Sequence, residues 1–421
     1  MLRYETAGGV LRNKRNTWDS IRAELIDRQA NDVAWVDGRL QGLNHYAGDD
    51  VLSVAMKAYE LYASTNPVSA RAFPSVIELQ NDIIQTSIGL LGGSSGSAGT
   101  VTSGGTESIF LALKSARDIA QQQRGIALPE IVLPSTAHPA FDKHAHYLGM
   151  KTIRVPVGGD YRADVEGMGS AVSANTIMVV GSAPCYPYGL FDPISALANL
   201  AKDSGLLMHV DACVGGYQAP FARELGYDIP EFDLSVPGVT SISADLHKYG
   251  FSLKGASVVL FQTDDLKQAS KFEFDNWPRG RYQTDTFAGT RSGGPVAAAW
   301  AVMRYLGAEG YLEVTKQLMQ MRDHALSRIA QSSSLQLVGK PELSLLAFSV
   351  PGHDISALSE KMLSYGWILN LINEPASLQI MINMSHRGHV DEFFDDLMTC
   401  MASPGSHINK SISDRGVTAE Y

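Results

Sequence analysis

The chain has few cysteines, no long apolar run and no excess of basic residues. Its three cysteines, Cys185, Cys213 and Cys400, are widely spaced and odd in number. This spacing argues against a disulfide framework and against a zinc site of the CxxC kind, so no metal centre is expected. No run of about 20 apolar residues occurs, and the first residues contain no apolar signal core. A cytoplasmic protein without a membrane span is therefore expected.

The negative net charge of the chain restricts the kinds of partner that are expected. The formal net charge of the 421 residues is −10, whereas nucleic acids are bound by basic surfaces. We therefore expect no nucleic-acid partner, although a local basic pocket for one phosphorylated small molecule is compatible with this charge. The content of hydrophobic residues, 45%, is typical of a globular protein, and the length indicates two lobes.

Short β-rich runs alternate with segments of helical length between about residues 105 and 262. This alternation is typical of a mostly parallel sheet with helices on both faces. Apolar residues at helical spacing predict a helix over 106–121, and the glycine- and serine-rich stretch 92–99 is expected to be a loop. Strands are expected at 130–134, 151–155, 176–180, 206–210, 240–243 and 257–261.

The C-terminal third of the chain has a different pattern. A long helical region is expected at 296–330, followed by strand-like runs at 345–350 and 378–383 and an amphipathic helix at 390–401. This order predicts a smaller α+β lobe. The expected division is an N-terminal segment (1–60), a large domain (61–295), a small C-terminal domain (296–405) and a flexible tail (406–421).

A glycine-rich turn, Ser103-Gly-Gly-Thr106, leads into the first of these helices. Glycines let the backbone approach a ligand closely, exposed N–H groups and the helix dipole favour an anion, and the two hydroxyls add donors. The turn lacks the Lys-Ser/Thr ending of a nucleotide P-loop. A glycine-rich helix start with an ordinary Ser or Thr cap explains the pattern equally well.

Three further residues follow predicted strands, where open α/β sheets bind ligands. Asp211 could keep a pyridine nitrogen protonated, or it could cap the next turn. Lys248 could form a Schiff base if desolvation lowers its pKa, although most lysines are solvated surface charges. His138 could stack on an aromatic cofactor or be structural. The order of phosphate turn, ring, acid and lysine along one domain is that of fold-type I pyridoxal-phosphate (PLP) enzymes.

These residues lie in blocks that resemble the PLP-dependent group II decarboxylase superfamily, and within it the sphingosine-1-phosphate lyase branch. The resemblance spans roughly residues 45 to 320 and implies an α/β, aspartate aminotransferase-like fold with a parallel-rich central sheet. It implies PLP as the cofactor. The resembling blocks are 66–75, 101–108, 138–143, 210–216, 238–250 and 288–294.

The resemblance assigns residues to the cofactor ring. It implies that Lys248 is the Schiff-base lysine, that Asp211 is the partner of the pyridine nitrogen, and that His138 is stacked on the ring.

The resemblance also assigns residues to the cofactor phosphate. Gly105, Thr106 and His247 are implied to hold it, and Ser292 to reach it from a neighbouring subunit. A homodimer with shared active sites is therefore expected.

Substrate residues are implied as well. The second lysine of the lyase branch follows the first after six residues, and Lys254 stands at that place. Tyr46 matches a tyrosine that approaches the substrate phosphate, and Tyr186 matches an aromatic position near the reacting carbon. We expect Lys254 or Tyr186 to act as the base.

The sequence departs from the lyase pattern at one position. The lyases usually read Asn-Pro-Leu-His where this chain has Asn66-Pro-Val-Ser69. That histidine contacts the substrate phosphate, so Ser69 weakens the expectation of a long-chain base phosphate. Arg71 could supply a different anion contact.

The expected substrate is a small amine, phosphorylated in the first hypothesis. The first hypothesis is retro-aldol cleavage of a phosphorylated 2-amino-1-ol to an aldehyde and an amine, because Lys254 and Tyr46 are both present. The second is decarboxylation of an amino acid, because of Ser69. The third is a catalytically silent PLP-fold binding protein, against which the intact Lys248 and Asp211 argue.

Overall fold

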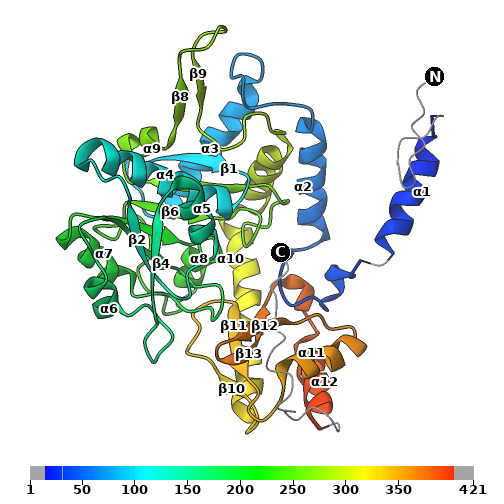
Figure 1. The fold of residues 1–421 in the computed structure, drawn as a ribbon. Coiled ribbons are helices and arrows are strands. Elements are labelled where there is room, and N and C mark those ends of the chain that lie inside the picture. Colours follow the sequence, from blue (N-terminus) through cyan, green and yellow to red (C-terminus); the bar gives the residue numbers. More distant parts are fainter. Residues whose placement is uncertain (1–14, 31, 403–421) are drawn as a thin grey trace, which may run out of the picture.

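The computed structural model describes residues 15–30 and 32–402 (Figure 1). A seven-stranded sheet lies at the centre of the larger lobe, in the order β1-β7-β6-β5-β4-β2-β3. The pairs from β6 to β3 are all parallel, whereas β7 is antiparallel to both of its neighbours. The strands are β1 (Ala98–Thr102), β2 (Glu130–Pro134), β3 (Lys151–Val155), β4 (Thr176–Ser182), β5 (Leu207–Asp211), β6 (Ser241–Ala244) and β7 (Ser257–Phe261).

The six strands predicted from the sequence coincide with β2 to β7. β1 was not predicted, since it begins inside the glycine-rich stretch expected to be a loop. Its Gly99 packs against β7 so closely that a Cβ atom there would lie 2.5 Å from a methyl carbon of Leu260. The glycine that makes this segment resemble a loop in the sequence is therefore what allows β1 to lie beside β7.

Helices cover both faces of this sheet. Alternate residues of β2 point to opposite cores, Ile131 and Leu133 to one and Val132 to the other, as the twofold period of a strand requires. The first core is completed by α4 (Gly105–Arg124) and α5 (Ala140–Leu148). The second includes residues of α3 (Pro74–Leu90), α7 (Ile194–Asp203), α8 (Ala219–Glu224) and α10.

The smaller lobe contains a four-stranded antiparallel sheet in the order β10-β11-β13-β12. The predicted strands correspond to β11 (Leu345–Ser349) and β13 (Ala376–Met381), while the short β10 (Gln336–Leu337) and β12 (Asn370–Asn373) were not predicted. The helices α10 (Gly294–Gln331), α11 (Ile355–Ser364) and α12 (Val390–Ala402) contribute to the core of this lobe. The long predicted helix is interrupted at Gly307, which has a φ of +54°.

The N-terminal part contains two helices ahead of α3. Helix α1 (Trp18–Gln29) has no buried residue and extends away from the body, whereas α2 (Asp49–Tyr62) packs along α10 (Figure 1). Between them, Leu40 forms an isolated parallel bridge with Ile368, so this segment runs beside the small lobe. A hairpin of β8 (Phe272–Phe274) and β9 (Tyr282–Thr284) projects from the large lobe.

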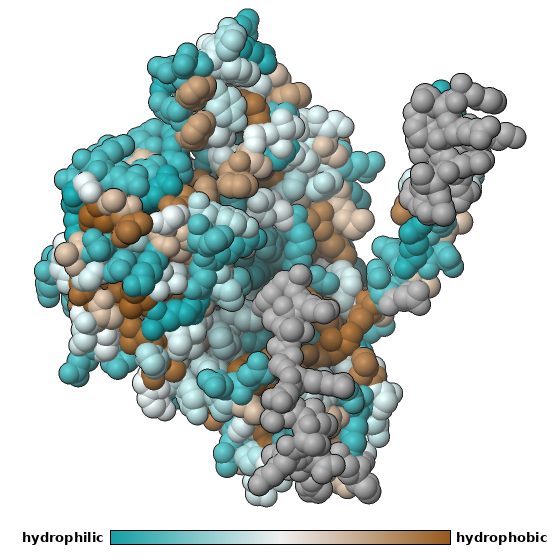
Figure 2. Space-filling model, viewed as in Figure 1, coloured by the Kyte–Doolittle hydropathy of each residue, from teal (hydrophilic) through white to brown (hydrophobic). Residues whose placement is uncertain are grey.

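The remaining elements are short: η1 (Trp35–Asp37), α6 (Val165–Ser170), α9 (Asp264–Ser270) and η2 (Met384–His386). The face shown in Figure 2 is mostly hydrophilic, with apolar residues in scattered patches. In the described part of the chain no helix combines the length and the apolar character needed to cross a bilayer. The predicted tail at 406–421 lies outside the described residues.

Candidate active site

A cavity of about 490 Å³ lies at the carboxyl ends of the parallel strands, where α/β sheets bind their ligands. The turn before α4 and the segments that follow β2, β4, β5 and β6 all contribute to its wall, as do Leu43, His45 and Met381. Most of the site residues expected from the sequence meet here. They are Gly105, Thr106, His138, Tyr186, Asp211, His247, Lys248 and Lys254.

The glycine-rich turn forms one wall of the cavity. Gly104 is the N-cap of α4 and no side chain caps the helix, so the alternative of an ordinary Ser or Thr cap is wrong. The Ser103 hydroxyl donates to Glu107 at 2.7 Å and is therefore engaged within the protein. A Cβ atom at Gly105 would lie 2.5 Å from the Cys213 sulfur and 3.0 Å from a carboxylate oxygen of Asp245. Only glycine fits there, and the backbone of the first helical turn is exposed to an anion.

Asp211 ends β5, and its interpretation as a cap of the next turn is confirmed, whereas its role toward a pyridine nitrogen stays a prediction. Its Oδ1 accepts hydrogen bonds from the backbone N–H of Cys213 at 3.1 Å and from the Ser243 hydroxyl at 3.4 Å, so it does cap the following turn. The same carboxylate lines the cavity. Beneath it, the ring of His209 lies between the hydroxyls of Ser241 and Ser243, at 2.9 and 3.2 Å. This network fixes the carboxylate in one orientation.

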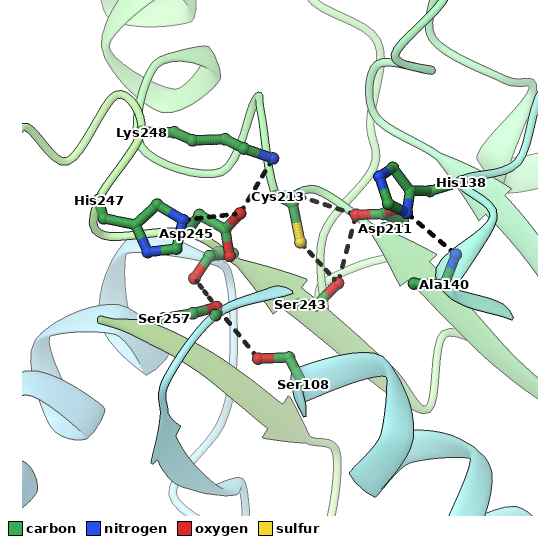
Figure 3. Close-up of polar contacts among 12 residues, drawn as sticks. Ser108, His138, Ala140, Asp211, Cys213, Ser243, Asp245, His247, Lys248 and Ser257 are labelled. Carbon is green, nitrogen blue, oxygen red and sulfur yellow. Dashed lines mark hydrogen bonds and ion pairs between the residues drawn. The ribbon is translucent and has the colours of Figure 1, made fainter. Parts of the chain in front are cut away.

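Lys248 and His247 both approach the buried carboxylate of Asp245 (Figure 3). The Lys248 amine lies 3.0 Å from Asp245 Oδ2, and His247 Nε2 lies 3.6 Å from the same oxygen. Burial alone would lower the pKa of Lys248, but the negative charges around the amine, Asp245 first among them, outweigh burial and raise this pKa. The expectation that desolvation lowers the pKa of Lys248 is therefore wrong in this structure, because the expectation left Asp245 out.

His138 lies across the cavity, beside Asp211 (Figure 3). Its Nδ1 accepts the backbone N–H of Ala140 at 3.1 Å, which holds the ring in place. Burial lowers the pKa of His138, and the charge of Asp211 only partly opposes this effect. The lowered pKa favours the neutral form of the ring, whose flat aromatic surface could stack on a cofactor.

Lys254 has the opposite electrostatic environment from Lys248. Its amine donates to the carbonyl of Leu43 at 2.7 Å and lies 3.5 Å from the carbonyl of His247. Desolvation and the positive charge of Lys248 lower the pKa of Lys254 to about 8, with Asp245 partly opposing them. An amine with this pKa can give up its proton near neutral pH, which is the property of a general base.

Four expected site residues do not line the cavity of this chain. The Tyr46 hydroxyl donates to Asp49 at 2.6 Å, and the Ser292 hydroxyl donates to the carbonyl of Ala63 at 2.8 Å. Ser69 and Arg71 lie in the exposed segment between α2 and α3. Their roles toward the substrate, and that of Ser292 toward a neighbouring subunit, stay predictions.

Asp245 and His45 are among the cavity residues that were not predicted from the sequence. Asp245 has a signal, since it lies one helical turn before Lys248 just after a strand, but its pairing becomes evident only in three dimensions. His45 has no signal in the sequence, because it lies about 200 residues before the lysine segment against which its ring packs.

The cavity fits a flat, phosphorylated pyridine. An amine (Lys248), a carboxylate (Asp211) and a neutral aromatic ring (His138) surround one space, and glycines leave room for a phosphate at a helix N-terminus. His247 supports the same assignment, since its buried Nδ1 has no hydrogen-bond partner among the described residues and can donate to a phosphate. These residues would hold PLP by its amine-reactive carbon, its ring nitrogen and its phosphate.

Comparison with known proteins agrees with this geometry. Residues 39–351 match the family described as the pyridoxal-dependent decarboxylase conserved domain. Sphingosine-1-phosphate lyase of Arabidopsis thaliana is 40% identical over 394 residues, which are 91% of this chain and 72% of that protein. Sphingosine-1-phosphate lyase of Drosophila melanogaster is 37% identical over 402 residues, covering 92% of this chain and 74% of that protein.

Solved structures show the same fold. The sphingosine-1-phosphate lyase of Burkholderia pseudomallei superposes with a TM-score of 0.90 at 33% identity and covers 94% of this chain and 93% of that one. Glutamate decarboxylase of Lactobacillus brevis has a TM-score of 0.81 at 19% identity, over 95% of each chain, and supports the fold alone.

A first prediction concerns Lys248. With added PLP, the purified protein should gain a visible absorption band that borohydride abolishes, because the lysine amine condenses with the cofactor carbonyl. Lys248→Ala should lack this band, and Lys151→Ala, which changes an exposed lysine, should keep it. Absorption spectra before and after borohydride check this, and a reducible band in Lys248→Ala would contradict the role of Lys248.

A second prediction concerns Asp245. The Lys248 amine must lose its proton before it can react with PLP, and Asp245 holds that proton in place. In the protein stripped of cofactor, the rate of band formation should rise with pH. Asp245→Asn should shift this rise downward by at least about one pH unit, making the reaction at pH 7 about tenfold faster. Asp203→Asn on the surface is the matched control, and an unshifted profile would show that Asp245 does not set the pKa of Lys248.

Proposed function

This chain belongs to the pyridoxal-dependent decarboxylase family and is a PLP-dependent lyase, and on that premise we propose that it cleaves a phosphorylated 2-amino-1-ol. The bond broken is the one between the carbon that bears the amine and a neighbouring carbon that bears a hydroxyl. The products are an aldehyde and a phosphorylated amine. The three relatives described above with 33–40% identity are named sphingosine-1-phosphate lyases, which supports this choice of substrate.

The observation that carries this proposal is the second lysine in the cavity. Retro-aldol cleavage needs a base to remove the hydroxyl proton, whereas loss of carbon dioxide needs none. Lys254 lies in the cavity wall with a pKa of about 8, so a fraction of it is in the free-base form near neutral pH.

The residues of the cavity have different roles in the proposed reaction. When bound, PLP supplies an electron sink for the carbon that bears the amine. Asp211 would keep a proton on the pyridine nitrogen, and His138 would stack on the ring. Lys254 takes the hydroxyl proton, the oxygen forms a carbonyl as the carbon–carbon bond breaks, and the electron pair of that bond stays on the amine-bearing carbon. Protonation of this carbon then gives the amine product.

Tyr186 is the second candidate for the base. It lines the same cavity, and its ring lies edge-on to His138 with 6.5 Å between the ring centroids. The backbone carbonyl of Tyr186 accepts a hydrogen bond from Gln379 at 2.5 Å, so the segment that carries it is tied to the small lobe. We favour Lys254 because its lowered pKa suits proton transfer near neutral pH.

Decarboxylation of an amino acid is the alternative function. It is favoured by Ser69, which replaces the histidine expected to contact a substrate phosphate. Tyr46 and Arg71 were also expected at the substrate phosphate, and neither of them lines the cavity of this chain.

We further propose that the protein acts in the cytoplasm as a homodimer with shared active sites. Support for the dimer comes from Ser292. Its hydroxyl lies outside the cavity of its own chain, as expected of a residue that serves a neighbouring subunit.

Product analysis separates the two reactions. The holoenzyme is incubated with a phosphorylated sphingoid base, with shorter phosphorylated amino alcohols and with a panel of amino acids. We expect a long-chain or short-chain aldehyde together with phosphoethanolamine from the phosphorylated bases, and no carbon dioxide from any substrate. Release of carbon dioxide with formation of an amine would establish the decarboxylase instead.

The pH dependence tests the role of Lys254. Because the free-base form is the reactive one, kcat/KM should rise as the pH passes through about 8 and level off above it. Lys254→Ala should keep the PLP band, lose about 10²–10⁴-fold in kcat/KM and lose this rise. Lys254→Arg keeps the charge but cannot deprotonate, so it should be equally inactive. Normal turnover in either variant would remove Lys254 from the mechanism and leave Tyr186 as the base.

A further inference from the structure

His45 lies in a segment that is fixed against the small lobe. The backbone N–H of Gln41 donates to the carbonyl of Ile368 at 3.0 Å, and the side chain of Asn383 donates to the carbonyl of Asn44 at 3.1 Å. These bonds flank His45 on its N-terminal side, and the carbonyl of the residue after it accepts a further backbone bond. The position of the His45 backbone is therefore set by the fold.

Both ring nitrogens of His45 lack a partner. They are shielded from solvent and make no hydrogen bond to any residue that the structure describes. The ring packs edge-on against Tyr249, with 4.6 Å between the centroids, and Tyr249 is itself held by a hydrogen bond to the carbonyl of Ile382 at 2.9 Å. Shielded polar groups in native proteins nearly always have a partner. Since the ring of His45 lines the cavity, a group that binds there could supply the missing partner.

The surroundings of His45 favour an anion. Lys254 lines the same end of the cavity, and no carboxylate in the described chain forms an ion pair with it. Burial lowers the pKa of His45, and the positive charges of Lys254, Lys248 and His247 lower it further. The imidazole is therefore a neutral N–H donor inside a positive potential. A bound anion would gain from both the donor and the potential.

We propose that His45 is a ligand of the substrate phosphate, a role that rests on the proposed cleavage of a phosphorylated amino alcohol. The cofactor phosphate is expected at the glycine-rich turn before α4, which leaves the donor of His45 for a second anion. Ser69 and Arg71, expected at the substrate phosphate, do not line the cavity of this chain. His45, in contrast, does line the cavity.

The proposal also has a consequence for Lys254. A phosphate bound at His45 would favour the ammonium form of Lys254 and raise its pKa. The rise of kcat with pH reports the pKa of Lys254 in the substrate-bound enzyme, and the rise of kcat/KM reports it in the free enzyme. We therefore expect kcat to rise at a higher pH than kcat/KM.

The test compares two amines on the holoenzyme. Phosphoethanolamine and ethanolamine differ only in the phosphate, so the ratio of their dissociation constants, measured by titration calorimetry, reports phosphate recognition. His45→Phe keeps the packing on Tyr249 but removes the donor, and we expect it to lower this ratio about 10- to 100-fold, the usual loss for a hydrogen bond to a charged group. His45→Gln, which retains an N–H donor, should stay within about threefold of the unchanged protein.

Two controls make the result specific. The absorption band of bound PLP should be unchanged in both variants, which verifies their folding and cofactor content. His146→Gln alters an exposed histidine on α5 and should leave the ratio unchanged.

The outcomes separate this inference from the proposed function. One outcome would contradict only the role of His45. In it, the unchanged protein prefers phosphoethanolamine to ethanolamine and releases aldehyde from a phosphorylated base, and His45→Phe shows the same preference and also releases aldehyde. His45 is then not the phosphate ligand, although the proposed function stands. If the unchanged protein neither prefers phosphoethanolamine nor releases aldehyde, the proposed function and the role of His45 both fall.

Discussion

The buried carboxylate of Asp245 is the group on which the arrangement of the site depends. Its side chain is 2% exposed, and it attracts the amine of Lys248 from one side and the ring of His247 from another. A buried carboxylate is stable only when charges or hydrogen bonds compensate it, so these two side chains are held where the cavity needs them. The same carboxylate lies so close to Gly105 that the phosphate turn could carry no side chain there. One charge thus fixes the distance between the lysine and the phosphate turn.

The topology explains why so many functional residues lie in one short segment. β6 and β7 are antiparallel, and residues 245–256 connect them without a helix. A parallel partner would require a crossover of a dozen or more residues, usually through a helix on one face of the sheet. Here the chain instead turns back at the carboxyl edge of β6, and it carries Asp245, His247, Lys248 and Lys254 across the end of the sheet. The reversal that makes β7 antiparallel therefore also forms the floor of the cavity.

Much of this could be predicted from the sequence, because strand ends are local features. Runs such as 257–261 are apolar and bounded by turn residues, and the acid and lysine follow such runs directly. β1 escaped prediction because Gly99, which its packing requires, is a residue that sequence patterns associate with loops. The pKa of Lys248 and the position of His45 escaped for another reason. Each depends on which side chains are neighbours in the folded protein, whereas the sequence gives only the separation of residues along the chain.

The contrast between the two lysines follows from the same geometry. Lys248 lies 3.0 Å from Asp245, which stabilises its charge, whereas Lys254 donates to carbonyl oxygens and is subject to the positive charge of Lys248. The two lysines are six residues apart in the chain, and their pKa values shift in opposite directions. Asp245 pairs with Lys248, whereas desolvation and the charge of Lys248 outweigh the more distant Asp245 at Lys254. A site that must hold one amine in place and use another to accept a proton needs this difference. The fold achieves it by placing a single acid three residues before the first lysine and nine before the second.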